Sequence, residues 1–313
     1  MHMQRIKKIH WLFLIGMLFG MPKITGYGLP GINLGLSSFL DGGPLRPRPG
    51  LYYQQFLVNY NTHKFLNAEG KPLLGLPSPH YNEVSAICSI TYQANARVFR
   101  ALPGISVSLP IVLSSTVSHN TLCLTNSGGG VGDLVIGGFL QWSPGEYRET
   151  ARFVQRLEFD VKFPTGKNKS PRRAINPGDN VFCLNPYWAA TFYFNPRWAA
   201  SWRLYYLWCG TNHSTHFKAG DAFHMNLTTE FQAKPDLWVG INSYFLHQLK
   251  DNRVNGVKIP KSREQVFGVG PGFLYAFNVS YDLVFFGNLY FETLVKNRTQ
   301  GIAAVLRLFK YFN

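Results

Sequence analysis

Nine ionisable residues in the middle of the chain are spaced so that they could act together. They alternate with apolar residues in three segments, and they are Arg152, Arg156, Glu158, Asp160, Lys162, Arg197, Arg203, His224 and Glu230. Side chains two residues apart point to the same face of a β-strand. A face of this kind can form a ladder that selects passing solutes, or a network of ion pairs that fills a narrow interior. Both interpretations stay open from the residues alone.

The same residue types could also serve catalysis or hold a metal ion, and the sequence favours neither. A lipolytic barrel enzyme needs a Ser and His pair with an orienting polar partner on the lipid-facing side. His224 alternates with Phe223 and Met225, which places it on the opposite side. The stretch NSGGGVGD (126–133) lacks the Lys and Ser/Thr of a phosphate-binding loop. We therefore predict no catalytic residue, no metal and no cofactor.

Strands are the elements that must position these residues, because apolar residues recur with a period of two. In ARFVQRLEFDVKFPTG (151–166) the Phe, Leu and Val residues share one face, and the Arg, Glu, Asp and Lys residues share the other. After the N-terminal run, the chain offers no stretch of about 18 apolar residues for a spanning helix. Twelve strands are predicted at 50–60, 83–94, 104–116, 132–143, 151–163, 181–194, 197–209, 221–233, 237–249, 264–277, 279–293 and 300–312.

The segment NPYWAATFYFNPRWAASWRLYYLW (185–208) shows how this pattern excludes a membrane helix. A Pro inside a helix would cost about 3 kcal/mol, whereas Asn-Pro is an ordinary turn signal. The segment therefore predicts a hairpin that turns at Asn195-Pro196, with Arg197 and Arg203 facing the interior.

Connection lengths and aromatic residues decide between a soluble and a membrane-spanning β-protein. Tight turns alternate with longer polar loops, as in outer-membrane barrels. Tryptophans toward strand ends suit the two aromatic belts at the membrane surfaces, and we assign Trp142, Trp188, Trp198, Trp208 and Trp238 to them. A β-sandwich or a lipocalin-like barrel needs no such belts. We predict an all-β fold, a single antiparallel transmembrane barrel of about twelve strands over 50–313.

The N-terminal region divides into two predicted parts. Residues 1–26 combine basic residues with a short apolar run and indicate a signal peptide, with export to the outer membrane of a Gram-negative bacterium. Residues 27–49 are too rich in Gly and Pro for a strand. They are either a plug that folds into the lumen or a periplasmic tail, and the residues of interest are Leu40, Asp41, Arg46 and Arg48. In the plug, Arg46 and Arg48 would dock on lumenal carboxylates.

Charge and cysteine content add two expectations. The formal net charge is +15, but no motif for nucleic acid accompanies it. The four cysteines, Cys88, Cys123, Cys183 and Cys209, contain no CxxC pair. Export would permit a disulfide, but the spacing favours small apolar residues in strands and loops. The oligomeric state is left open by the sequence.

Several motifs carry a family resemblance. The motifs are GGVGDLVIGGFLQWSP (129–144), LEFDVKFPTG (157–166), the segment from NPGDN to YYLW (176–208), HFKAGDAFHMNLTTEF (216–231), VFGVGPGFLYAF (266–277) and GPLRPRPGLYYQQF (43–56). The chain resembles the outer-membrane family named "MetA-pathway of phenol degradation" over most of residues 40–280. Gly138 departs from the Pro that this family tends to have.

The resemblance implies a bacterial outer-membrane barrel that passes small, often hydrophobic or aromatic molecules. We therefore expect a passive or gated channel with lipid around it. The alternative is a structural barrel that holds lipopolysaccharide through the basic loop GKNKSPRR (166–173), since Lys and Arg neutralise phosphate groups.

Overall fold

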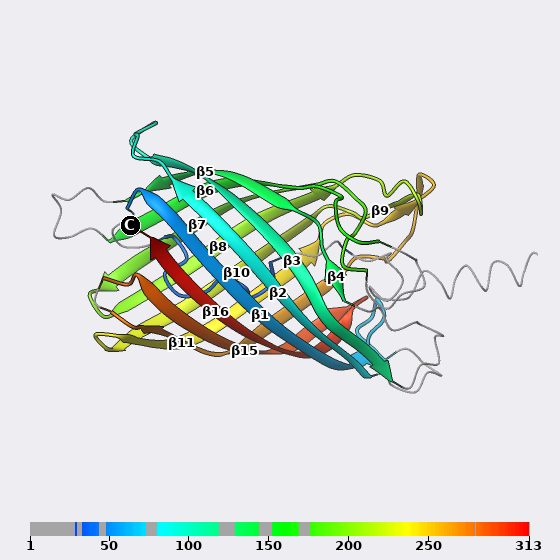
Figure 1. Ribbon diagram of the computed structural model, residues 1–313. Coiled ribbons are helices and arrows are strands. Elements are labelled where there is room, and N and C mark those ends of the chain that lie inside the picture. The colour runs from blue at the N-terminus through cyan, green and yellow to red at the C-terminus, as the bar shows by residue number, and fades with distance from the viewer. Residues whose placement is uncertain are drawn as a thin grey trace, which may run out of the picture.

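The computed structural model describes residues 29, 33–43, 48–72, 80–118, 129–143, 152–168, 176–278 and 280–312. Within these ranges, twelve long strands form the wall of one barrel (Figure 1). They are β1 (Gly50–Phe65), β2 (His80–Gln93), β3 (Leu102–Ser118), β5 (Val135–Trp142), β6 (Phe153–Lys162), β7 (Cys183–Asn195), β8 (Trp198–Cys209), β10 (Ala222–Lys234), β11 (Leu237–Gln248), β14 (Gln265–Ala276), β15 (Leu283–Lys296) and β16 (Thr299–Phe312). The expected signal peptide, 1–26, lies outside the described residues.

Antiparallel hydrogen bonding closes this sheet into a ring. Wall strands that follow one another in the chain are paired, and β1 also pairs with β16 from Leu51–Phe312 to Phe65–Thr299. A closed ring leaves no free strand edge, so the backbone polar groups are satisfied within lipid. The predicted all-β, twelve-stranded antiparallel barrel is confirmed.

The two ends of the barrel differ. At the turn end, β7 and β8 are joined by Pro196-Arg197, β10 and β11 by Pro235-Asp236, and the last strand finishes there. At the loop end, longer connections carry the short strands β4 (Gly130–Val131), β9 (Phe217–Lys218), β12 (Arg253–Val254) and β13 (Val257–Lys258). The last three form a small separate sheet. No helix in the described part of the chain is long and apolar enough to cross a membrane.

Strand β6 shows how the sequence sets the two faces of the wall. Leu157 and Phe159 are each 49% exposed on the outside, whereas Glu158 between them is 6% exposed and faces the lumen. An Arg or Lys on the lipid face at mid-membrane would cost about 2–4 kcal/mol. The alternation therefore fixes the register, since a slip by one residue would place the charges in lipid.

Three of the predicted belt tryptophans lie near the ends of their strands. Trp142 and Trp198 are at the turn end, where the Trp142 indole donates to the Phe99 carbonyl at 3.0 Å. Trp208 is at the loop end, and the Lys218 ammonium lies 5.3 Å from its ring centroid.

The other two tryptophans correct the prediction. Trp188 faces outward but lies in the middle of β7, where it packs edge-to-face on Trp202 with ring centroids 5.6 Å apart. Trp238 faces the lumen, is 2% exposed, and donates to the Tyr281 hydroxyl at 3.0 Å. Its even position in β11 puts it opposite Leu274, which is also buried inside, so it cannot belong to a lipid-facing belt.

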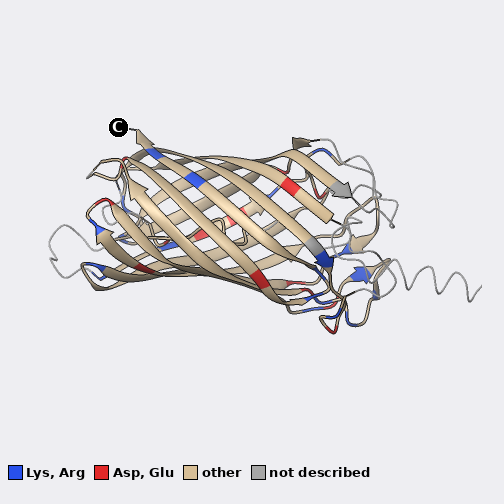
Figure 2. Cartoon of the chain, turned by 90° about the horizontal axis from the view of Figure 1, so that it is seen from below, with Lys and Arg blue, Asp and Glu red and all other residues tan. Residues whose placement is uncertain are grey.

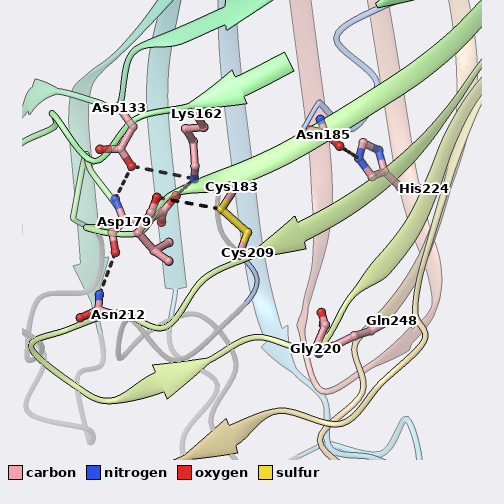
Figure 3. Close-up of a disulfide and its surroundings, with 11 residues drawn as sticks. Asp133, Lys162, Asp179, Cys183, Asn185, Cys209, Asn212, Gly220, His224 and Gln248 are labelled. Atoms are coloured by element: carbon pink, nitrogen blue, oxygen red, sulfur yellow. Dashed lines mark hydrogen bonds and ion pairs between the residues drawn. A yellow bond between two sulfur atoms is a disulfide. The ribbon is translucent and has the colours of Figure 1, made fainter. Parts of the chain in front are cut away.

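A disulfide joins Cys183 to Cys209 at the loop end of the β7–β8 hairpin (Figure 3). The two residues are directly paired across the strands, with Cα atoms 4.1 Å apart. The interpretation that favoured unpaired cysteines is therefore wrong for these two. Cys88 is a free thiol, and Cys123 lies outside the described residues.

Removal of this disulfide provides the first prediction. The double substitution Cys183→Ser/Cys209→Ser should lower the free energy of unfolding by about 2–4 kcal/mol, because the cross-link restricts the unfolded chain. Urea unfolding of the refolded barrel in detergent measures the change, and Cys88→Ser is the control with no expected effect. Equal stability of the double variant and the parent would contradict a bonded pair.

Candidate functional site

Residues 33–43, which we call the lumenal segment, run inside the ring of strands (Figure 1). Phe39 is 1% exposed and belongs to a buried cluster with Val154, Trp238 and Leu274 from three wall strands. Full burial of a Phe side chain contributes about 2 kcal/mol. Residues 33–43 of the predicted plug region therefore lie in the lumen, while their action as a gate stays a prediction.

Hydrogen bonds from inward-facing side chains hold the turn-end half of the lumenal segment. The backbone N–H of Leu40 donates to both carboxylate oxygens of Glu230, at 3.0 and 3.2 Å. The N–H of Gly42 donates to the Thr191 hydroxyl at 2.9 Å. These contacts satisfy main-chain groups that have no strand partner, which a buried backbone requires. Glu230 thus anchors the segment.

The ion pair between the lumenal segment and the wall has the acid on the segment and the base on the wall, whereas arginines of the plug region were expected to bind carboxylates of the wall. The Asp41 carboxylate of the segment forms an ion pair with Arg203 of β8, and the Arg203 guanidinium lies 4.4 Å from the Tyr187 ring centroid. Arg48 instead pairs with Asp282 in the turn before β15, at the rim of the barrel. Arg46 lies outside the described residues.

The loop-end half of the segment is held by amides and phenols that the sequence analysis missed. Asn226 accepts from the N–H of Gly35 at 3.0 Å and donates to the Ser37 hydroxyl at 2.7 Å. The Tyr290 hydroxyl donates to the carbonyl of Gly35 at 3.0 Å. The sequence signal for these residues is that Asn, Ser, Thr and Tyr occupy alternate positions of the wall strands, on the face that points into the lumen. These residues carry no charge, so the charge pattern does not reveal them.

Gly42 is the point of closest approach between the segment and the wall. A Cβ atom added there would lie 2.4 Å from both the Thr191 nitrogen and the Val154 carbonyl oxygen. Both are backbone atoms of the β6–β7 ladder, so they cannot move aside cheaply. The absence of a side chain at Gly42 therefore permits the docked position.

The space that the segment leaves open is a cavity of about 590 Å³ beside β1, β2, β3 and β6. Small inward side chains such as Ser85, Ser89 and Ser106 line it on one side. Five of the predicted lumen residues line it as well, namely Arg156, Glu158, Asp160, Lys162 and Arg203. The structure thus brings these five together on one cavity.

Most of these charges are bonded to neighbours. Glu158 accepts hydrogen bonds from the Ser106 and Tyr187 hydroxyls, and it forms an ion pair with Arg156 at 3.4 Å. The Arg156 Nε donates to Gln141 at 2.9 Å. The charged side chains are therefore held in place while they still face the cavity.

The remaining predicted lumen residues lie elsewhere. His224 is fully buried, stacked on Tyr205 with ring centroids 4.1 Å apart, and its Nε2 is 3.2 Å from the Asn185 side-chain oxygen. Arg152 is exposed just before β6 at the turn end.

Arg197 does not face the lumen, which corrects the prediction. It belongs to the turn between β7 and β8, beyond the strand alternation, and its guanidinium lies 4.9 Å from the ring centroid of outward-facing Phe231.

Three of the family-like motifs meet at Asp133, at the loop end (Figure 3). Its two carboxylate oxygens accept from the N–H groups of Gly166 and Asp179, each at 2.8 Å. Lys162 pairs with Asp179 and lies 3.9 Å from Asp133. Burial raises the pKa of the Asp133 carboxyl, against the opposing effects of the Asp179 N–H and the Lys162 ammonium. The glycine-rich motifs therefore build a clamp over the cavity mouth.

A second hollow, of about 810 Å³, opens on the outer face of the wall. Its lining is mostly apolar, and includes Leu140, Leu157, Phe159, Trp188, Leu204 and Phe223. Glu158 and Tyr187 line both this hollow and the lumenal cavity. We call it the wall pocket.

Two residues account for the wall pocket. A Cβ atom at Gly138 would meet nothing within 4 Å, so the missing side chain leaves open space. Pro186 has no N–H to donate, and the β7–β8 pairing passes from Leu184–Trp208 to Tyr187–Tyr205 without a pair at Pro186. The ladder is thus interrupted where the pocket lies.

The described residues contain no group of three or more His, Cys, Asp and Glu side chains that could hold a metal ion. Of the predicted lipopolysaccharide contacts, Lys169, Arg172 and Arg173 lie outside the described residues. Lys167 donates to the Gly129 carbonyl at 3.1 Å.

The close fit of Gly42 gives the second prediction. Gly42→Ala should displace the lumenal segment and speed amide exchange of residues 33–43 about fivefold to tenfold, since a lost hydrogen bond is worth about 1 kcal/mol. Hydrogen–deuterium exchange of the detergent-solubilised barrel measures this. Gly138→Ala is the matched control, because its added methyl meets open space. Unchanged exchange in Gly42→Ala would show that the segment is not held at this point.

The outer membrane channel from Pseudomonas putida F1 is similar to this chain with a TM-score of 0.74 and 16% identity, over 90% of this chain and 100% of that chain. The toluene transporter TbuX from Ralstonia pickettii gives a TM-score of 0.44 and 10% identity, over 95% of this chain and 99% of that chain. The TM-score for TbuX is too low to support a common fold.

The P. putida F1 likeness shows the fold, that of an outer-membrane barrel. No curated protein matches the chain significantly. The family model described as "Putative MetA-pathway of phenol degradation" matches residues 81–308. Because this match covers well over half of the chain, the protein belongs to that family.

Proposed function

We propose that this barrel is a channel that carries small hydrophobic or aromatic molecules across the outer membrane, without chemistry and without a cofactor. The observation that carries the proposal is that the wall pocket and the lumenal cavity share Glu158 and Tyr187. The two hollows thus lie on opposite sides of the same stretch of wall. The family description, which names phenol degradation, fits this substrate class.

The chemistry of the two cavities suits an aromatic molecule that leaves the membrane. Apolar binding sites are usually lined by hydrophobic and aromatic side chains with a few polar groups that fix orientation. The wall pocket supplies Trp188, Leu204 and Phe223 as apolar surface, and Tyr187 and Glu158 as polar groups at its inner side. A phenol-like molecule would exchange lipid for these rings and then meet the hydrogen-bonding groups of the cavity.

The lumenal segment is the proposed gate. Side chains of β5, β7, β8, β10 and β15 hold it, and its own residues Asn33, Leu34 and Leu36 line the cavity. A segment that is fixed by individual hydrogen bonds can shift without opening the wall, since the strand ladders do not include it. The proposal includes export by the N-terminal signal and a turn end that faces the periplasm.

A bulky side chain in the wall pocket tests the channel. Gly138→Phe should abolish most of the barrel-dependent uptake of radiolabelled toluene by cells that lack other aromatic channels, because the ring fills the pocket. The matched control is Ile241→Phe, since Ile241 is 64% exposed on the outer face of β11, away from the pocket. Both variants should reach the outer membrane in equal amounts, as measured by heat-modifiable migration on gels.

Two results would count against the proposal in different ways. Uptake by the parent protein no faster than in cells without the barrel would refute a channel for this substrate class. Normal uptake by Gly138→Phe would leave the channel intact and exclude the wall pocket as its entrance.

A further inference from the structure

We propose that Arg197, Lys234 and the Trp198–Phe231 ring pair form a binding site for an anionic phospholipid at the turn end of the barrel. The cations would bind the headgroup phosphate, and the rings would pack on the upper part of an acyl chain. This site is independent of the lumen and of any transported molecule.

Strand pairing brings these residues together from two adjacent turns. Trp198 at the start of β8 pairs with Phe231 of β10. The N–H of Gln232 donates to the Arg197 carbonyl at 2.8 Å, and the Arg197 Nε donates to the Gln232 carbonyl at 3.1 Å. Lys234 is the last residue of β10, two positions further along. The two cations therefore border the same patch of wall.

The aromatic side chains of the site face lipid. Ring centroids of Trp198 and Phe231 are 4.9 Å apart, and Trp198 is 45% exposed on the outer wall. The Arg197 guanidinium lies 4.9 Å from the Phe231 centroid, so the cation lies over one ring of the pair. An indole near the membrane surface marks the headgroup level. This order, with charge above aromatic rings, follows the order of phosphate and acyl chain in a lipid.

The charges of this end are available to a headgroup. Arg197 and Lys234 are exposed, and neither has an acidic ion-pair partner among the residues that the structure describes. Nearby Asp282 is paired with Arg48, and half-buried Asp236 is the other acid in these turns. Figure 2 shows Lys and Arg at both ends of the barrel, including the end that carries the C-terminus.

Electrostatics favours an anionic lipid over a neutral one at such a place. Each Lys or Arg close to an anionic membrane surface strengthens association about fivefold. The Arg guanidinium also binds phosphate through two parallel hydrogen bonds, which fixes the headgroup position. In a barrel of this type the short turns face the periplasm, so the bound lipid is a phospholipid of the periplasmic leaflet.

Titration of the full barrel in neutral detergent tests the site. Short-chain phosphatidylglycerol should bind more tightly than short-chain phosphatidylcholine in isothermal titration. Arg197→Gln and Lys234→Gln should each weaken phosphatidylglycerol binding about fivefold, and added salt should reduce the difference. The matched control is Arg253→Gln/Lys258→Gln, which removes two exposed cations at the loop end and should leave the affinity unchanged.

Three results would overturn the inference. One is equal phosphatidylglycerol affinity in the parent and in Arg197→Gln/Lys234→Gln. Another is an equal loss in the loop-end control, which would indicate unspecific charge attraction. The third is inorganic phosphate or lipid A that competes as well as phosphatidylglycerol, which would make the site one for free anions or for the other leaflet. Circular dichroism and heat-modifiable migration confirm that each variant is folded.

Discussion

The structure depends on the rule that polar groups of a membrane barrel must be satisfied inside it. Lipid offers no hydrogen-bond partner, so the charged alternate positions of β6, β8 and β10 can only point inward. The lumenal segment brings in further main-chain groups, and they too need partners there. Glu230 and Arg203 point inward and also bind the segment, because the Glu230 carboxylate accepts a hydrogen bond from the Leu40 N–H and Arg203 forms an ion pair with Asp41. Interior charge thus stabilises the segment instead of merely filling the space.

This arrangement divides the interior into two regions. The segment occupies the region beside β7, β8, β10 and β15, with Phe39 in a dry cluster around Trp238. Beside β1, β2 and β3, serine side chains leave room for the cavity, and the Ser108 hydroxyl donates to Ser89 at 2.9 Å. Because Asn33, Leu34 and Leu36 of the segment line the cavity, displacement of the segment would enlarge the cavity without breaking the wall ladders.

The sequence predicted most of the wall, since period-two alternation and turn residues are local signals. It failed where position depends on distant partners. Trp238 resembles a belt residue in the sequence, yet the parity that β11 takes from its neighbours turns the indole inward. Arg197 has the inward parity of β8, but it lies in the turn, where alternation no longer applies.

The disulfide was within reach of the same reasoning. Cys183 and Cys209 lie within about one residue of opposite positions on the predicted hairpin, and the bulge between Tyr193 and Asn195 brings them into direct pairing. The contacts of the lumenal segment, by contrast, follow from no local pattern.

The charged face of β6 was predicted to be either a selectivity ladder or an ion-pair network, and the geometry shows why these interpretations need not compete. Arg156 and Glu158 are bonded to each other and to Gln141, Ser106 and Tyr187, yet both also line the cavity. A solute that approaches them must replace bonds already formed, so polar solutes gain little from the exchange. An aromatic molecule loses no such bond and can pack on the adjoining ring of Tyr187. A ladder whose charges are mostly bonded to neighbours would therefore disfavour polar solutes while it tolerates aromatic molecules, which is the selectivity that the proposed channel requires.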